Sequence, residues 1–317
     1  MPSVDENLRT CVVVNPRSQG GATERNWGLL SDVIRKHFGP FEVRFTSGPG
    51  DGKRQARGAI DEGFEMVVAM GGDGTISEVA DGFIEGETPV RKDAVLGVLP
   101  AGTGGDFRRT LGLPKTLPEA ASALRGKKTA AIDLGRLEFT GHDGKPEVRH
   151  FINIASFGIG GLVDKYVNQS SKALGGTLSF ALATLKAGLD YKNANVRVVI
   201  DGAPPREGRI YNIAVANGRY FGGGMKVAPD AALDDGWFDV VTLGDFGFTD
   251  LVFRGLDIYS GKHLKNPKVT VHRARKIEAT PIDGSAEVLL DVDGEAPGRL
   301  PATFVLLEGA LKVRAKA

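Results

Sequence analysis

Residues 66–78 read Met66-Val67-Val68-Ala69-Met70-Gly71-Gly72-Asp73-Gly74-Thr75-Ile76-Ser77-Glu78 and contain an apolar run, a glycine-rich turn and the start of a periodic pattern. The apolar run predicts a buried strand, and the helical spacing of apolar residues from Ile76 to Phe83 predicts a helix after the turn. Glycines let the backbone approach a ligand closely, and the N–H groups at the start of a helix suit a phosphate. The carboxylate of Asp73 would repel a phosphate unless a cation lay between them, so these residues predict a metal–nucleotide site.

Strand and helix patterns alternate through the first 133 residues. The expected strands are Cys11–Val14, Phe41–Thr46, Met66–Met70 and Ala94–Leu99, and the expected helices are Ala22–Phe38, Asp51–Gly63, Thr75–Ile84 and Thr116–Arg125. This alternation predicts a parallel sheet covered by helices, in which ligands bind beyond the carboxyl ends of the strands. Three loops that follow strands are therefore expected at one sheet edge: Asn15–Gly21, Gly71–Thr75 and Pro100–Asp106.

Strand-like runs separated by turn residues become frequent from about residue 134. They are Leu134–Phe139, Val148–Ala155, Val196–Ile200, Tyr211–Ala216, Phe238–Leu243, Val269–His272, Lys276–Ala279, Val288–Val292 and Thr303–Leu307, with helical patterns near Val163–Leu189 and Thr249–Tyr259. We therefore expect an α/β domain at residues 1–133 and a mainly antiparallel β domain at residues 134–302. The C-terminal segment, about 303–317, can pack in either domain.

The composition excludes several classes of protein. A formal net charge of +1 over 317 residues gives no bulk attraction for nucleic acid, so no nucleic-acid partner is expected. The N-terminus does not resemble a signal peptide, and the uncharged runs are too short to span a bilayer, so we expect a cytoplasmic protein with at most peripheral membrane contact. Cys11 is the one cysteine, and we expect it to be a buried thiol. Signatures of P-loop kinases, dehydrogenases, zinc hydrolases and serine hydrolases are missing.

Five segments that contain small residues, hydroxyls and acids follow one another along the chain. They are Asn15–Gly21, Gly71–Glu78, Pro100–Phe107, Lys226–Asp239 and Asp291–Glu295, the last followed by Leu300-Pro301-Ala302. In this order they resemble the diacylglycerol kinase and sphingosine kinase superfamily, and above all its soluble bacterial lipid kinases. The resemblance implies a three-layer nucleotide-binding domain, similar to those of NAD kinase and phosphofructokinase, followed by a β-sandwich domain that carries the acceptor.

The resemblance also implies a site for ATP and Mg²⁺. ATP would lie against Asn15, Pro16, Arg17, Ser18, Gln19, Thr46, Gly72, Asp73, Gly74, Thr75, Ile76, Ser77, Glu78 and Thr103. A water-linked acidic network around magnesium would contain Asp73, Asp106, Asp133 and Asp235, with Asp73 counted among the catalytic residues. The Asp235 carboxylate and the backbone carbonyls of Ala232 and Trp237 would hold a metal in the second domain. Glu295 would accept the proton of the substrate hydroxyl.

Some positions depart from the family pattern or have two interpretations. Asparagine often stands in the family where this chain has Gly105 and Ser77, so nucleotide affinity or choice can differ. The apolar region Phe151–Leu189 is our candidate for acyl-chain binding, and ordinary core packing explains it equally well. Outside the resemblance, Glu295 would be interpreted as a solvated hairpin acid.

The expected reaction is transfer of the ATP γ-phosphoryl group to a lipid hydroxyl, with diacylglycerol as the first candidate acceptor. The lipid would come from a membrane surface, the site is expected in a cleft between the two domains, and a homodimer stays open. One alternative is an NAD kinase or sugar-phosphate kinase, against which Pro100–Phe107 and Asp293-Gly294-Glu295 argue. Another is a non-catalytic lipid- or nucleotide-binding regulator, against which the acids Asp73, Asp106, Asp235 and Glu295 argue.

Overall fold

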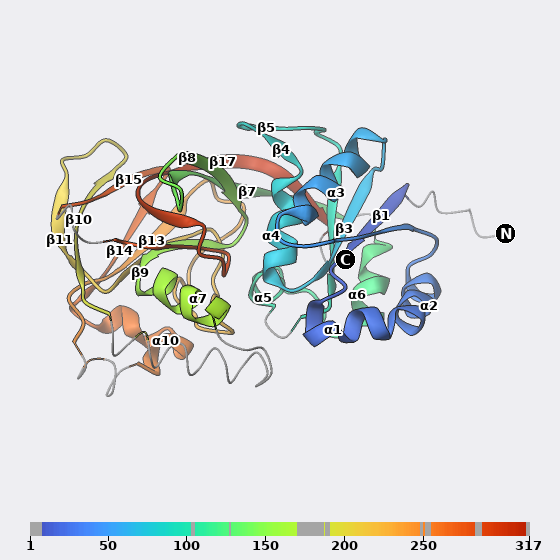
Figure 1. Ribbon diagram of the computed structural model, residues 1–317, viewed down its shortest axis with the longest axis horizontal. Helices are drawn as coiled ribbons and strands as arrows, with labels where there is room; N and C mark the ends of the chain where they lie inside the picture. The colour runs from blue at the N-terminus through green and yellow to red at the C-terminus, as the bar shows by residue number, and fades with distance from the viewer. Residues whose placement is uncertain are drawn as a thin grey trace. The chain divides into compact units, whose positions relative to one another are not determined.

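A computed structural model of the chain describes residues 8–102, 105–126, 128–169, 187, 191–247, 250, 255–282 and 287–314 (Figure 1). The chain divides into two units, one formed by Met1–Ile132 with Gly309–Ala317 and the other by Asp133–Glu308. We call them the first and the second unit and describe each by itself. None of the helices in these described ranges is long and apolar enough to cross a bilayer.

The first unit is built on a parallel sheet. Its strands are β1 (Thr10–Val14), β2 (Glu42–Phe45), β3 (Met66–Gly71) and β6 (Val95–Pro100), in the order β6-β3-β1-β2. The end of β17 (Gly298–Arg314) lies parallel to β6, with Lys312 beside Val95. Every residue of β1 and β3 is buried, as expected for strands covered on both faces.

Helices cover both faces of this sheet and make three layers. The helices of the first unit are α1 (Ser18–Arg25), α2 (Trp27–His37), α3 (Asp51–Asp61), α4 (Asp73–Asp81), α5 (Asp106–Thr110) and α6 (Leu117–Leu124). One face of the sheet packs on α2 and α6 through Ile34 and Leu124, and Figure 1 shows α3 and α4 on the opposite face. A small hairpin, β4 (Ile84–Glu85) with β5 (Thr88–Pro89), follows α4.

The prediction of a single helix at Ala22–Phe38 is wrong. The segment contains two helices, α1 and α2, which meet at Asn26 with φ −108° and ψ 14°. Gln19, Gly20 and Gly21 have positive φ at the start of α1, so this part of the chain is a glycine-dependent turn. The apolar residues that predicted the helix, Trp27, Leu30, Ile34 and Phe38, all follow Asn26, so their spacing describes α2 and does not extend to residues 22–25.

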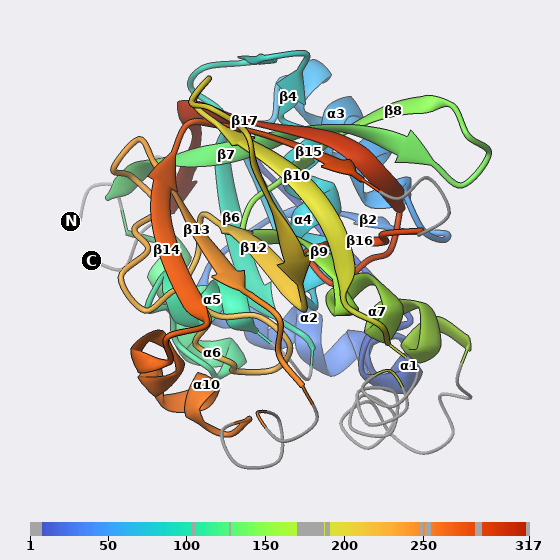
Figure 2. The same cartoon turned by 90° about the vertical axis from the view of Figure 1, so that its left-hand side faces the viewer.

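The second unit contains two antiparallel sheets. One has the order β14-β13-β12-β9-β16, from β14 (Val269–Ala274), β13 (Phe238–Leu243), β12 (Asn212–Ala216), β9 (Ile154–Gly158) and β16 (Leu290–Val292). The other pairs β11 (Arg206–Ile210), β10 (Ala194–Ile200), β15 (Lys276–Pro281) and β17, with β7 (Thr129–Gly141) and β8 (Pro146–Phe151) continuing from β17. Figure 2 shows β12, β13 and β14 of the first of these sheets beside β10, β15 and β17 of the second.

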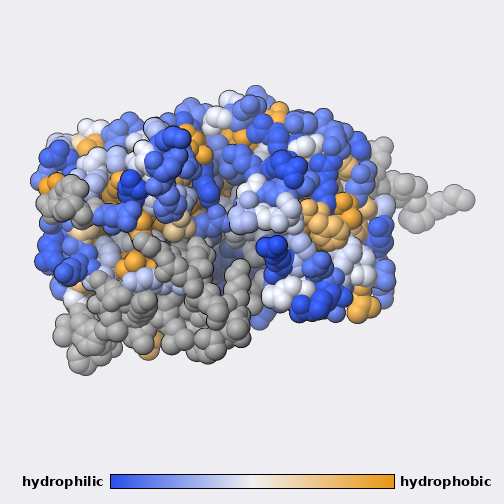
Figure 3. All heavy atoms as spheres, viewed as in Figure 1, coloured by the Kyte–Doolittle hydropathy of each residue, from blue (hydrophilic) through white to orange (hydrophobic). Residues whose placement is uncertain are grey.

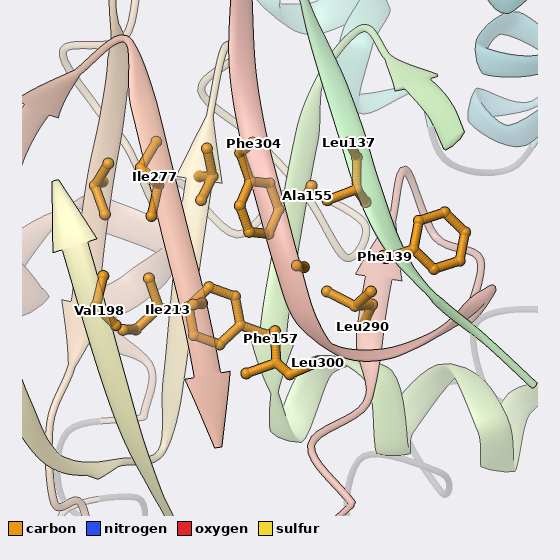
Figure 4. Close-up of a cluster of buried hydrophobic side chains, with 14 of the residues drawn as sticks. Leu137, Phe139, Ala155, Phe157, Val198, Ile213, Ile277, Leu290, Leu300 and Phe304 are labelled. Carbon is orange, nitrogen blue, oxygen red and sulfur yellow. The ribbon is translucent and has the colours of Figure 1, made fainter. Parts of the chain in front are cut away.

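The core of the second unit lies between these sheets. Figure 4 shows Phe157 and Ile213 facing Phe304 and Ile277 across the space between the layers. The rings of Phe157 and Phe304 stack with their centroids 5.8 Å apart. The predicted fold class, a three-layer α/β domain with a second domain that is a mainly antiparallel β-sandwich, is therefore confirmed.

Some elements of the second unit differ from the sequence prediction. The strand expected at Val148–Ala155 is two strands, because the N–H groups of residues 152–154 donate to the carboxylate of Asp293 between β8 and β9. The strand β11 was not expected. Of the helix expected at Val163–Leu189, α7 (Ile159–Gln169) is present, and residues 170–186 and 188–190 lie outside the described residues. About half of the acyl-chain candidate is therefore described, and its residues Phe151, Ile154 and Phe157 are buried in the core. Of the helix near Thr249–Tyr259 we find α10 (Asp257–Ser260), followed by the 3₁₀ helix η2 (Lys262–Lys265).

Candidate active site

The glycine motif of the first unit forms a tight turn between β3 and α4. Gly72 precedes α4 with φ −87° and ψ −175°, and no side chain caps this helix start with a hydrogen bond. The loop after β6 approaches so closely that a Cβ added to Gly102 would lie 2.6 Å from the Cα of Gly72. Two loops therefore meet backbone to backbone at the carboxyl ends of neighbouring strands, and only glycine fits at Gly102.

The first loop, after β1, joins the same place. The Asn15 amide donates to the hydroxyl of Thr75 at 3.1 Å, and the Asn15 side-chain oxygen accepts from the Arg17 N–H at 3.0 Å. Asn15 also donates its backbone N–H to the Met70 carbonyl. The structure thus brings Asn15, Thr75 and the turn at Gly72 together, as the topology of a parallel sheet requires.

Asp73 fixes the loop after β6 to this turn. Its carboxylate accepts backbone N–H groups of Gly105 at 2.7 Å, Asp106 at 3.2 Å and Phe107 at 3.2 Å, which are the groups at the start of α5. Gly105 has φ +91°, a region that glycine and asparagine adopt more readily than other residues, so its departure from the family asparagine is compatible with this turn. Thr103, expected in the nucleotide site, lies outside the described residues.

Glu78 fixes the loop after β2 in the same way. Its two carboxylate oxygens accept the backbone N–H groups of Gly50 at 2.7 Å and Gly52 at 2.8 Å. Thr46, at the start of this loop, is buried and donates its N–H to the Val14 carbonyl at 2.9 Å. Asn15, Thr46 and Gly72 thus follow neighbouring strands at one edge of the sheet. The predicted nucleotide residue Ile76 is buried, and Glu78 contacts protein backbone.

The nucleotide part of this site fits a bound phosphate. The start of α4 offers N–H groups that no side chain caps, and the backbones of Gly72 and Gly102 meet beside them. The acids at this edge already have partners: Asp73 has backbone N–H groups, and Asp106 pairs with Arg109. Among the described residues, no three His, Cys, Asp or Glu side chains form a metal-binding group.

Glu295 lies in the second unit, at a tight turn after β16. Its carboxylate pairs with Arg149 of β8 at 2.8 Å, and 37% of each side chain is exposed. Val292 and Glu295 exchange backbone hydrogen bonds across the turn, and Asp293 occupies it with φ +50°. The buried Asp293 carboxylate holds the backbone of residues 152–154 at 2.9 to 3.1 Å, so the turn that carries Glu295 is fixed to the β8–β9 connection.

The second-domain loop proposed to hold a metal has a different arrangement. Asp235 accepts the Trp237 N–H at 3.1 Å with one carboxylate oxygen and pairs with Arg273 through the other. Burial raises the pKa of nearby Asp239, Arg273 opposes this shift, and the charge of Asp235 adds to it. The Asp235 carboxylate, with the carbonyls of Ala232 and Trp237, does not fit a metal while Arg273 neutralises it, so we derive no step through a metal there.

Asp133 also lies in the second unit. It is buried and accepts the Gly236 N–H at 2.8 Å, which connects the start of this unit to the loop of Asp235. Sequence reasoning missed Arg149 and Arg273, the partners of Glu295 and Asp235. Each partner is far away in sequence, by 146 residues for Arg149, and neither arginine belongs to a motif, so only the fold reveals them.

Two family models match the chain in succession. The diacylglycerol kinase catalytic domain matches residues 9–137, and the YegS C-terminal NAD kinase beta sandwich-like domain matches residues 153–315. The protein named diacylglycerol kinase of Staphylococcus carnosus (strain TM300) is 29% identical over 308 residues, covering 96% of this chain and 94% of that protein. The diacylglycerol kinase of Staphylococcus aureus (strain bovine RF122 / ET3-1) is 30% identical over 308 residues, covering 96% of this chain and 91% of that protein.

Solved structures share the fold. The crystal structure of a putative diacylglycerol kinase from Bacillus anthracis str. Sterne has a TM-score of 0.74 at 23% identity and covers 98% of both chains. Yeast NADH kinase complexed with NADH has a TM-score of 0.52 at 12% identity, covering 98% of this chain and 84% of that one. Both likenesses concern the fold, and they agree with an α/β unit followed by a β-sandwich.

Proposed function

Because this chain belongs to the diacylglycerol kinase and sphingosine kinase superfamily, we propose that it transfers the γ-phosphoryl group of ATP to the hydroxyl group of a lipid. Membership in this family makes it a kinase-family protein. The use of ATP and Mg²⁺, the lipid acceptor and the roles of single residues are the parts that we add. Diacylglycerol, named in its relatives, is the first candidate for the acceptor.

The observation that carries the proposal is the start of α4. Its first N–H groups have no side-chain cap, and the backbones of Gly72 and Gly102 meet beside them. A helix start of this kind stabilises negative charge, and the glycines admit a triphosphate close to the backbone. Asp73 and Glu78 accept backbone N–H groups of the neighbouring loops and so fix these loops around the start of α4 before a nucleotide binds.

Glu295 is the proposed proton acceptor. Phosphoryl transfer depends on positioning and charge neutralisation, and Mg²⁺ bound with ATP would neutralise charge on the transferred group. The part left to the protein is to take the proton from the lipid hydroxyl, and a carboxylate on a fixed turn suits that task. Arg149 keeps the Glu295 carboxylate in one position until the hydroxyl group takes its place as a partner.

The test is product identification. The purified chain is incubated with ATP, Mg²⁺ and a bacterial lipid extract, and mass spectrometry searches for any lipid that gains one phosphate. We expect phosphatidic acid as the product, and another phosphorylated lipid would keep the reaction and change the acceptor. A parallel reaction offers NAD, and phosphorylation of NAD alone would contradict the proposal. Nucleotide binding with no phosphorylated product from any acceptor would favour a non-catalytic regulator.

A further inference from the structure

The turn that contains α10 and η2 in the second unit combines an anchored inner side with an exposed outer side. It runs from Leu256 through α10, the left-handed Gly261 with φ +76°, and η2 to Asn266. Burial and contacts distinguish an inner side, which packs on the second unit, from an outer side, which is exposed.

The inner side fixes the turn to the β-sheet that contains β12 and β13. Ile258 and Leu264 pack against buried residues of that sheet, and the Lys226 N–H donates to the Ile258 carbonyl at 2.9 Å. His263 is buried, its Nε2 lies 2.9 Å from the Val227 carbonyl oxygen, and burial lowers its pKa, which favours the neutral ring. The outer side chains are thus presented by a fixed backbone.

The outer side exposes two large apolar side chains next to two lysines. Leu256 is 83% exposed and Tyr259 is 52% exposed. Lys262 and Lys265 are also exposed, and among the described residues no carboxylate pairs with either of them. The nearby Lys268 differs, because it pairs with Asp250 at 2.7 Å. The acid of this turn, Asp257, is only half-exposed at the start of α10.

We propose that the outer side of this turn, Leu256, Tyr259, Lys262 and Lys265, is a docking surface for an anionic lipid bilayer. A leucine and a tyrosine that point outward can enter the interfacial region, where tyrosine is favoured because its ring is apolar and its hydroxyl stays hydrated. The two lysines supply the complementary charge, and each raises binding to an anionic bilayer by about fivefold. The inference deepens the proposed function, since a lipid kinase must reach its acceptor at a bilayer.

A bilayer fits this surface better than a protein partner does. Stable protein interfaces bury about 800 Å² on each partner around a largely uncharged centre. Two apolar side chains flanked by lysines are too few for such an interface, but they suffice for reversible attachment to a membrane surface. The face seen in Figure 3 is mainly hydrophilic, with apolar residues in small separate groups, so single exposed side chains are not in themselves evidence of docking.

The test is co-sedimentation with vesicles of phosphatidylcholine, with and without phosphatidylglycerol, in the absence of nucleotide. We expect the wild-type chain to bind the anionic vesicles, to bind the neutral ones weakly, and to lose binding at high ionic strength. The variant Leu256→Asp/Lys262→Glu/Lys265→Glu should bind at least tenfold more weakly. The variant Lys262→Arg/Lys265→Arg keeps the charge and should bind like the wild type.

A matched control changes the net charge equally at other exposed positions: Leu29→Asp/Lys92→Glu/Lys145→Glu. Equal losses in the control and in the docking variant would overturn the inference, as would failure of the wild type to bind anionic vesicles. Unchanged vesicle binding with a variant-dependent change in oligomeric state would replace the bilayer by a second protein chain. Equal denaturation midpoints show that the variants are folded.

Turnover on detergent-dispersed lipid separates this inference from the proposed function. A docking variant that keeps this turnover while it loses vesicle binding supports both ideas. A wild-type chain that binds anionic vesicles but phosphorylates no lipid would overturn the proposed function and leave the docking surface in place. Turnover on dispersed lipid without any binding to anionic vesicles would support the proposed function and overturn the docking surface.

Discussion

Asp73 in the first unit and Glu295 in the second are both acids in motif turns, but different groups hold their carboxylates. Asp73 accepts three backbone N–H groups from the loop after β6, and Glu295 pairs with the side chain of Arg149. A backbone-held carboxylate cannot leave its partners unless the loop moves, whereas an arginine side chain can rotate away. We infer that Asp73 builds its site and that Glu295 is able to change partners during a reaction.

Asp293 extends the comparison within one turn. It lies two residues before Glu295 and, like Asp73, accepts three backbone N–H groups, from residues 152–154. Asp73 and Asp293 therefore hold backbone segments in position, whereas Glu295 is partly exposed and pairs with an arginine. Replacing each acid by its amide should separate these roles, because the amide keeps the shape and removes the charge.

Glu295→Gln should give the largest effect. We expect kcat for lipid phosphorylation to fall on the order of 10²–10⁴-fold, because the amide cannot accept the proton. The free energy of unfolding should change by less than about 1 kcal/mol, since the lost ion pair is partly exposed. Steady-state kinetics and denaturant titration measure the two quantities.

The matched control for this variant is Glu287→Gln. Glu287 lies in the same unit, is half-exposed and pairs with Arg299 at 3.7 Å, so its loss removes a similar surface ion pair. Turnover of the control should stay at the wild-type level. Near-normal turnover of Glu295→Gln would assign proton transfer to another group and remove the distinction drawn above.

Asp73→Asn should act on stability in the first unit. The amide cannot accept all three N–H groups, and losing charge-assisted hydrogen bonds costs about 1–3 kcal/mol. Burial raises the pKa of the Cys11 thiol to about 11, so this single cysteine should react with thiol reagents only when the first unit opens. The rate of Cys11 labelling should therefore increase in Asp73→Asn.

Asp293→Asn tests whether the effect on Cys11 labelling is specific to changes in the first unit. It removes an equivalent set of hydrogen bonds from the second unit and should lower the denaturation midpoint of that unit. If the two units unfold separately, Cys11 labelling in this variant stays at the wild-type rate. Equal labelling in both amide variants would show that the units open together, and an unchanged rate in Asp73→Asn would contradict the structural role of Asp73.

Low pH should have the smallest effect, and it tests another acid that accepts a backbone N–H group, Asp51. Burial by itself would raise the pKa of Asp51, but hydrogen bonds from the N–H and hydroxyl of Ser47 outweigh it and hold the pKa below 3.8. A lowered carboxylate pKa adds stability above the unfolded value, and this is lost as the pH falls through the folded value. The denaturant midpoint should therefore fall less in Asp51→Asn than in the wild type when the pH is lowered from above 3.8 to below it. The same fall in both proteins would exclude this contribution of Asp51.

Much of the fold could be predicted from local patterns. The buried strands of the first unit are short apolar runs between turns, and the glycine motif lies where the strand–turn–helix pattern puts it. The breaks could not be predicted, because distant residues or backbone angles cause them. Asp293 divides β8 from β9 from more than 130 residues away, and the backbone angles at Asn26 separate α1 from α2.

The candidate site shows the same limit. The resemblance implied ligand or catalytic roles for Asp73, Glu78 and Glu295, but it did not reveal which groups of the protein hold these carboxylates. The roles of Asp73 and Glu78 as acceptors for backbone N–H groups depend on tertiary contacts between loops. The Glu295–Arg149 pair joins the turn after β16 to β8, a strand of the other sheet, and the sequence does not reveal how these two segments meet.

The last strand, β17, begins in the second unit and ends in the first, where Lys312 and Val313 lie beside Val95 and Leu96 of β6. During synthesis on the ribosome, the residues that form β6 emerge early, yet β6 lacks this neighbour until β17 has been synthesised. The first unit is therefore completed only after the second unit has been made. Until then the edge of β6 is open to pairing with other strands, and removal of the residues of β17 that pair with β6 should destabilise the first unit before the β-sandwich.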